Sequence, residues 1–280
     1  MVDTSRSADW NVMDFGNRDR LMQTIKEEAD EFFQHTSKPE NWEASTASGH
    51  WQVRDIVGHI VDVTEGYLEA FELARSGRDA PPPLGLRAMS ELADQNARAF
   101  RSESQDTMIG RLRTGYERLM QTFEELTEDD WMGLMVPHKY MGPAPAFIFP
   151  TFQLVDYGVH NWDIREGLGV PNGLPGPVAD FLAPVMFSLW QGILDADRLG
   201  NDSIDIGIKV TGRNPGLYAV TATREGLSFE PFDDASLDPP AVIEFDPASL
   251  VLTAYDRIHG GTGYGDRAMI DRFRSAFFTI

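Results

Sequence analysis

The spacing of apolar residues changes once along the 280-residue chain, near residues 200–202. Before this point apolar side chains recur every three or four residues, as they do on one face of an α-helix. One such run consists of Leu21, Ile25, Ala29, Phe32 and Phe33. After residue 202 apolar and polar residues alternate, which is the period of a strand with one buried face. One such run is Ile204, Ile206, Ile208 and Val210. We therefore expect a helical domain over residues 1–199 and a small α+β domain over residues 200–280.

Five helical segments are expected in the first two-thirds of the chain. They cover residues 21–33, 52–77, 88–126 with a break near Ser104, 151–168 and 178–198. Residues 131–150 contain four prolines and two glycines, so we expect an irregular loop there. Helices of this number commonly pack as a bundle, whose interior can hold a metal site. In the last 80 residues we expect four strands and two helices, with the glycine-rich run 260–265 as a connecting loop.

The charge balance and the lack of cysteine exclude several classes of function. The chain carries 24 basic and 44 acidic residues, which gives a formal net charge of −20. Such a field repels phosphate backbones and anionic lipid headgroups, so we expect no nucleic-acid or membrane partner. Without cysteine there are no disulfides, iron–sulfur centres or cysteine nucleophile. A metal must be bound by His, Asp, Glu or backbone oxygen, and a reactive thiol must come from a cosubstrate.

Two segments bear on the location of the protein. Residues 1–10 are polar and lack the apolar segment of a signal peptide. The most apolar stretch, residues 181–194, contains Pro184 and is too short to span a bilayer. We therefore expect a cytoplasmic protein.

The residues that suggest a chemistry lie in two helical segments about a hundred residues apart. His59 lies in the first, and Asp156 and His160 lie four residues apart in the second, so these two project from nearly the same helix face. Side by side, the helices would bring one carboxylate and two imidazoles around one divalent ion. Three ligands and one open position are typical of a catalytic metal site. The alternatives are a hydrogen-bonded core histidine for His59 and an ordinary contact across one helical turn for the other two.

Two further residues are candidates for the same site. Asp163, three residues after His160, is placed to hold an imidazole nitrogen from behind, or else to pair with Arg165 or Arg54. His138 lies in the expected irregular loop, where it would either close over a site or remain a surface histidine. The sequence contains no nucleophile elbow, phosphate-binding loop or dinucleotide glycine pattern.

Both histidine segments carry a family resemblance. Residues 51–60, Trp-Gln-Val-Arg-Asp-Ile-Val-Gly-His-Ile, resemble the signature Trp-x-Val-Arg-Asp-Leu-Val-x-His-Leu of the mycothiol-dependent maleylpyruvate isomerase family. Residues 156–163 resemble the second motif of that family, Glu-x-x-x-His-x-x-Asp, with Asp156 in place of Glu. The resemblance implies a DinB-like four-helix bundle. The C-terminal unit is similar to the small α+β sterol-carrier-protein-like domain that often follows it.

The resemblance also implies a set of site residues. In this family the matching residues bind a divalent metal, usually zinc, and here they are His59, Asp156 and His160. A family arginine from the second domain serves the isomerase reaction, and its best match is Arg257. Residues 254–256 depart from the small residue and glycine that usually precede that arginine.

Three functions are compatible with these residues. The resemblance implies a metal-dependent enzyme that uses mycothiol or a similar low-molecular-weight thiol to isomerise, or add to, an unsaturated small-molecule acid in a cleft between the domains. Thiol S-transfer on the same scaffold is the first alternative. The second is a non-catalytic small-molecule-binding protein with a vestigial metal site. The name of the DinB superfamily suggests a DNA-damage nuclease, but such a role conflicts with the acidic charge.

Overall fold

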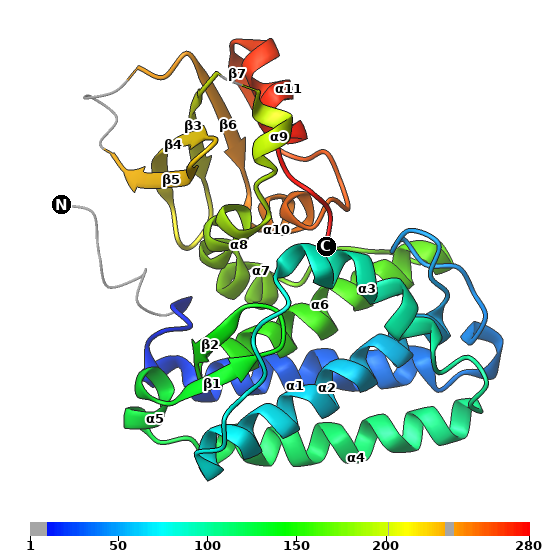
Figure 1. The fold of residues 1–280 in the computed structure, drawn as a ribbon. Coiled ribbons are helices and arrows are strands. Elements are labelled where there is room, and N and C mark those ends of the chain that lie inside the picture. Colours follow the sequence, from blue (N-terminus) through cyan, green and yellow to red (C-terminus); the bar gives the residue numbers. More distant parts are fainter. Residues whose placement is uncertain (1–9, 201, 233–237) are drawn as a thin grey trace. The chain divides into compact units, whose positions relative to one another are not determined.

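The chain divides into two compact units in a computed structural model that describes residues 10–200, 202–232 and 238–280 (Figure 1). The helical unit spans Val12–Leu174, and the sheet unit comprises Pro175–Ile280 together with the N-terminal segment that ends at Asn11. Residues 175–199, which we expected in the helical domain, therefore belong to the sheet unit. Residues 1–9 and Asn201, to which the expectations about the N-terminal segment and the domain boundary refer, lie outside the described residues.

Six helices build the helical unit (Figure 1). They are α1 (Arg18–Thr36), α2 (Val53–Ser76), α3 (Leu86–Arg98), α4 (Gln105–Glu124), α5 (Glu128–Gly133) and α6 (Ile148–Leu168). Helix α1 packs against α6, and α2 packs against both α3 and α4. The expected break near Ser104 is present because the side chain of this residue accepts a hydrogen bond from Thr107 N at 3.2 Å and so begins α4. Helices α2 and α6 both end at a left-handed glycine, Gly77 and Gly169.

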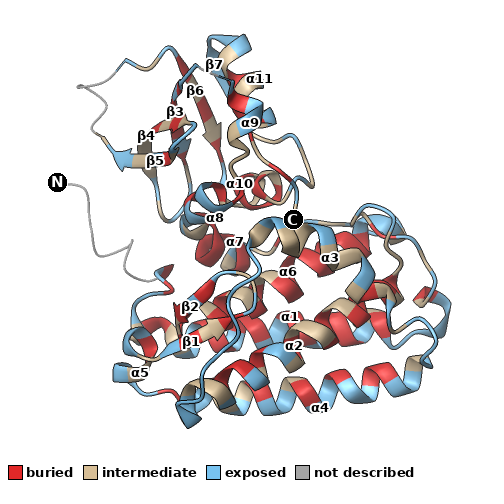
Figure 2. Ribbon diagram, in the orientation of Figure 1, coloured by how far each residue is buried: buried red, intermediate tan, exposed pale blue. Residues whose placement is uncertain are grey.

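Aromatic side chains dominate the core of the helical unit. Figure 2 shows the buried residues as stripes along the helices, as amphipathic helices require. The largest fully buried aromatic side chains in this unit are Phe32, Phe71, Phe123, Trp131, Phe149 and Tyr157. Phe71 and Phe149 meet edge to face with ring centroids 5.1 Å apart, which joins α2 to α6. Each such ring contributes about 1.5–3 kcal/mol by burial.

Residues 131–150 are ordered, so the expected irregular loop is wrong. The segment contains the end of α5 and a β-hairpin, β1 (Met135–His138) and β2 (Gly142–Pro145), in which Pro137 lies opposite Pro143. A two-stranded hairpin tolerates proline because each strand has a free edge that needs no donor. Strand β1 packs against α2. Three of the four prolines are thus part of a strand pair that lies on the bundle, and the fourth, Pro150, lies in the first turn of α6.

A five-stranded sheet of order β5-β4-β3-β6-β7 forms the second unit. Its strands are β3 (Ile204–Val210), β4 (Gly216–Thr223), β5 (Gly226–Pro231), β6 (Ala241–Phe245) and β7 (Thr262–Gly265). Strands β3 and β6 are parallel, and the other neighbours are antiparallel. Helices α10 (Pro247–Ala254) and α11 (Arg267–Ser275) complete the order that the sequence predicts. The expected fold class, a helical region followed by an α+β unit, is confirmed; its likeness to sterol carrier proteins stays a prediction.

Two segments of the sheet unit differ from expectation. Residues 178–198 form α7 (Gly176–Leu182), a 3-10 turn (Ala183–Val185), α8 (Met186–Ile193) and α9 (Ala196–Leu199) instead of one helix, because Pro184 has no N–H to continue the ladder. The glycine-rich run forms edge strand β7. A side chain at Gly265 would place Cβ 2.3 Å from Pro240 O, and φ there is +81°. This glycine serves close backbone approach rather than a ligand.

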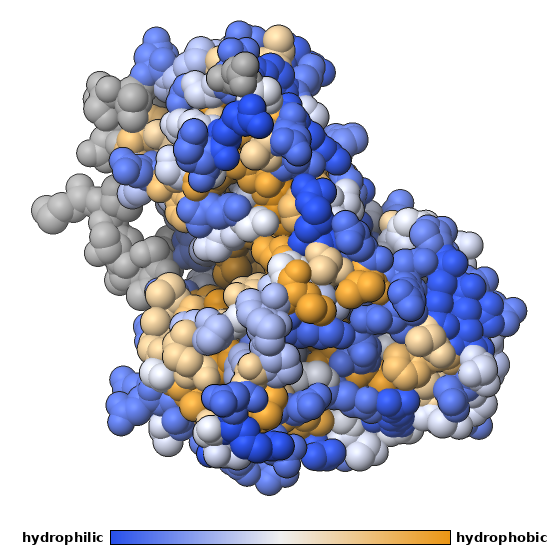
Figure 3. All heavy atoms as spheres, in the orientation of Figure 1, coloured by the Kyte–Doolittle hydropathy of each residue, from blue (hydrophilic) through white to orange (hydrophobic). Residues whose placement is uncertain are grey.

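The surface in view is largely hydrophilic, with apolar side chains gathered in smaller patches (Figure 3). This agrees with the 44 acidic and 24 basic residues of the chain. Within the described ranges, every helix is too short or too polar to cross a membrane.

Candidate metal centre

The structure brings His59, Asp156 and His160 together. One nitrogen of each imidazole and one carboxylate oxygen all lie within 4.8 Å of one another. His59 comes from α2, and the other two come from adjacent turns of α6. The distance from His59 Nε2 to Asp156 Oδ1 is 3.6 Å. The ring centroids of His59 and His160 are 5.2 Å apart. The shorter Asp156 side chain therefore reaches the histidines despite lacking one methylene of Glu.

Asp163 sets the orientation of His160. Its side chain is fully buried, and its Oδ2 lies 2.9 Å from His160 Nδ1. A carboxylate at this distance accepts the Nδ1 proton, which places the lone pair of the neutral ring on Nε2. The structure thus places Asp163 behind the imidazole, as one of the two sequence interpretations expected.

The donor set suits a divalent cation. Two imidazole nitrogens and one carboxylate oxygen are ligands that zinc accepts, with a fourth position left for water or substrate. Asp156 Oδ2 is buried and has no hydrogen-bond partner among the residues that the structure describes, and an unpaired buried carboxylate oxygen is costly. A cation held by the three side chains would offset that cost, so the residues present fit a metal.

A glycine before His59 lets two helices approach closely. A Cβ at Gly58 would lie 2.4 Å from Ala97 O on α3, closer than any real Cβ contact. Helix α3 therefore packs directly on the turn of α2 that carries the histidine. Nothing in the pattern of residues 52–77 indicated that α3 would be this neighbour.

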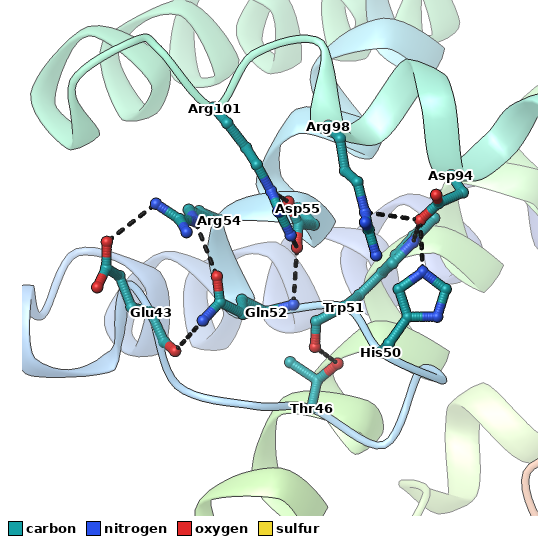
Figure 4. A network of polar contacts seen from close by, with 10 residues as sticks. All are labelled: Glu43, Thr46, His50, Trp51, Gln52, Arg54, Asp55, Asp94, Arg98 and Arg101. Carbon is teal, nitrogen blue, oxygen red and sulfur yellow. Dashed lines mark hydrogen bonds and ion pairs between the residues drawn. The ribbon is translucent and has the colours of Figure 1, made fainter.

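Trp51 forms one wall of the centre. Its ring centroid lies 5.3 Å from His59 and 6.1 Å from His160. Its indole Nε1 donates a 3.0 Å hydrogen bond to Asp94 on α3, which also pairs with Arg98 at 2.8 Å (Figure 4). The indole held in this way lies against both imidazoles, and the His59 side chain is left 21% exposed.

A buried ion pair fixes the start of α2. Asp55 is fully buried and accepts hydrogen bonds from Arg101 Nε at 2.7 Å and Nη2 at 2.6 Å, and from Gln52 N at 2.9 Å (Figure 4). Burial pushes the pKa of Asp55 up, but the hydrogen bonds and the charge of Arg101 outweigh it and lower the pKa. This anchor lies one helical turn before His59.

His138 is a buried residue near the centre, not a surface histidine. It is 8% exposed and ends β1, where its ring lies among Tyr67, Phe149 and Phe152. Its Nδ1 accepts hydrogen bonds from Tyr140 N at 3.3 Å and Met141 N at 3.2 Å. Burial lowers the pKa of His138 to about 4, against an opposing effect of the Asp156 charge.

Arg257 lies in the sheet unit, just after α10. Its Nη1 donates a 2.7 Å hydrogen bond to Tyr255 O. The preceding Asp256 takes the left-handed conformation, with φ +56°, in which glycine is usual. The bonds Arg257 N to Leu252 O and Asp256 N to Thr253 O close the helix end. Asp256, which stands where the family usually has glycine, therefore adopts the backbone conformation that glycine would have.

Sequence reasoning missed one residue that the structure places at the centre, Trp51. Trp51 stands in the sequence only as the first residue of the family signature, because an aromatic residue eight positions before His59 gives no signal that the two rings meet. His138 was a candidate from the sequence, but its burial was not predictable because the prolines around it favoured a loop. Hairpin pairing, which buries the ring, depends on contacts that residues 131–150 make with α2.

Comparison with known proteins identifies the family. The crystal structure of mycothiol-dependent maleylpyruvate isomerase is similar at a TM-score of 0.59 and 14% identity, over 89% of this chain and 94% of that chain. A histidine-to-alanine mutant of it gives a TM-score of 0.58 with the same identity and coverage. At this identity the likeness shows the fold alone. No curated protein sequence matches the chain. The family model described as the mycothiol maleylpyruvate isomerase N-terminal domain matches residues 23–165, more than half of the chain and all three residues of the centre, so the chain belongs to this family.

Proposed function

We propose that the protein is a metal-dependent isomerase that uses mycothiol, or a similar low-molecular-weight thiol, on an unsaturated small-molecule acid. The observation that carries the proposal is the convergence of His59, Asp156 and His160 within 4.8 Å. Membership of the family and the likeness to a mycothiol-dependent maleylpyruvate isomerase support the choice of thiol and substrate class.

The three side chains would hold the metal, and the rest of the centre would orient them. A bound divalent ion lowers the pKa of a thiol, so that the thiolate is present at neutral pH. Asp163 accepts the Nδ1 proton of His160, so that the Nε2 lone pair of this ring would face the metal. Trp51 lies against both imidazoles and would limit their contact with water, which strengthens electrostatic interactions at the site.

The reaction requires no oxidant and no net proton change. The thiolate attacks one carbon of a double bond conjugated with a carbonyl group, and the π electrons move to the carbonyl oxygen. The former double bond is then single and rotates. When the carbonyl re-forms, the carbon–sulfur bond breaks and the thiolate leaves, so the double bond returns with the opposite geometry. We assign to Arg257 the role of binding a substrate carboxylate, as the family resemblance suggests.

A turnover assay tests the proposal. Zinc-loaded protein is mixed with mycothiol and maleylpyruvate, and the cis and trans isomers are followed by proton NMR. We expect isomerisation that needs both zinc and thiol, and that is lost in His59→Ala. His259→Ala, at an exposed histidine of the sheet unit, is the matched control and should keep full activity.

Each other outcome has a defined meaning. Isomerisation without thiol or metal contradicts the proposal. A stable thioether product would mean that the protein catalyses thiol transfer and not isomerisation. Protein that binds no metal and turns nothing over, yet binds apolar small molecules, is a carrier with a vestigial site.

A further inference from the structure

His138 is a buried imidazole that the proposed metal centre does not use. Its 8% exposure is unusual for a polar ring at the end of a short hairpin. Its ring meets α2 through Tyr67 and α6 through Phe149 and Phe152. Burial of this kind requires a reason, because a polar group in an apolar setting costs free energy unless its hydrogen bonds are made.

The hairpin turn determines which ring nitrogen carries the proton. Two backbone N–H groups, those of Tyr140 and Met141, donate to His138 Nδ1 at 3.3 and 3.2 Å. Nδ1 must therefore be the unprotonated acceptor, and the single proton of the neutral ring lies on Nε2. Since burial lowers the pKa of His138 to about 4, the ring remains neutral at physiological pH.

The Nε2–H group is directed away from the turn. Nε2 is separated from Nδ1 by Cε1, so its N–H points in a different direction from the two backbone donors of the turn. Tyr67 is two turns after His59 on α2, and Phe152 is one turn before Asp156 on α6, so the ring lies along the same helix faces as the centre. The charge of Asp156 is felt at His138. No residue in the three described ranges accepts a hydrogen bond from Nε2.

We propose that His138 is a substrate-contacting residue, whose Nε2–H donates a hydrogen bond to the carbonyl oxygen of the unsaturated acid. The inference rests on the proposed function. When the thiolate adds to the double bond, negative charge develops on this oxygen. A fixed neutral donor stabilises that charge without giving up its proton, and no reorganisation is needed because the turn already holds the ring. The proton stays on Nε2 throughout, so the balance of the reaction is unchanged.

Two substitutions separate the donor from the structural role. In His138→Asn, the amide oxygen replaces Nδ1 as acceptor for the turn, but nothing replaces Nε2–H. In His138→Gln, the longer side chain returns an N–H donor near the position of Nε2. We expect kcat of the Asn variant to fall about 10²-fold, the loss typical of removing one such donor, with zinc stoichiometry and KM for mycothiol unchanged. The Gln variant should recover at least tenfold of that loss.

A measurement without turnover keeps the two proposals distinguishable. The ¹⁵N NMR spectrum of zinc-loaded protein should show the Nε2–H tautomer of His138, and acetopyruvate, a dioxo acid that has no isomerisable double bond, should shift its proton resonance. Unaltered kcat in a folded, zinc-loaded Asn variant would overturn the inference, as would an Nδ1–H tautomer or an unmoved resonance at saturating acetopyruvate. Wild-type protein that is inactive on maleylpyruvate but shows the shift would contradict only the proposed reaction.

Discussion

Replacement of Asp55 tests how the start of α2 is held in place. This carboxylate is fully buried and accepts three hydrogen bonds, two from Arg101 and one from Gln52 N. Asp55→Ala removes a helix-capping bond, which is about 1 kcal/mol. It also removes two charge-assisted bonds of about 1.5–3 kcal/mol each. Arg101 is 35% exposed and regains water, so part of this is recovered. We expect the free energy of unfolding to fall by about 3 kcal/mol, which is at the lower end of the range for breaking a buried ion pair.

An exposed pair of the same geometry provides the matched control. Arg111 and Glu65 also form two parallel bonds, at 2.5 and 2.7 Å, but their side chains are 41% and 42% exposed. Glu65→Ala should therefore cost no more than about 1 kcal/mol. Urea unfolding of both variants, followed by circular dichroism, measures the difference. Equal losses in the two variants would refute the reasoning, because they would show that burial of Asp55 adds nothing.

The same pair gives a pH dependence. The pKa of Asp55 is lower in the folded protein than its ordinary value of 3.8. The unfolded chain therefore binds the proton first as the pH falls, and the stabilisation is present above that value and is lost as the pH drops through the folded pKa. Asp55→Asn, which is uncharged at every pH, should lack this acid-dependent loss.

Two further predictions concern His138 and Asp256. Burial lowers the pKa of His138 from 6.5 to about 4, so the unfolded chain binds its proton more readily between these values. Stability should thus fall on acidification across this interval, by on the order of 3 kcal/mol, and less so in His138→Asn; parallel stability–pH curves would contradict this. At Asp256, with φ +56°, glycine should give a free energy of unfolding about 1 kcal/mol above that of alanine. Equal unfolding midpoints of the Asp256→Gly and Asp256→Ala variants would show that this conformation is unstrained.

Helical periodicity explains why the residues of the centre were predictable. Asp156 and His160 share a helix face whatever surrounds them, because 3.6 residues per turn fixes their relation. The pairing of α2 with α6 followed from the family resemblance, since spacing alone left ordinary core contacts open.

The parts that could not be predicted depend on contacts between distant residues. Prolines in 131–150 favoured an irregular loop, whereas β1 and β2 pair with each other and β1 packs on α2. Residues 175–199 are apolar and helical, but their periodicity does not say which unit they join. The ring centroids of Phe187 and Tyr218 are 4.5 Å apart, and those of Trp190 and Phe245 are 6.3 Å apart. These contacts place α8 on the sheet.

Metal binding tests the central claim most directly. Purified protein is stripped with a chelator, dialysed against zinc, and analysed for metal by mass spectrometry, with His160→Ala as the test variant and His259→Ala as the control. Wild-type protein and the control should each retain one equivalent of zinc per chain, and the test variant should retain none. Wild-type protein that stays metal-free at saturating zinc, or a His160→Ala variant that retains a full equivalent, would contradict the account.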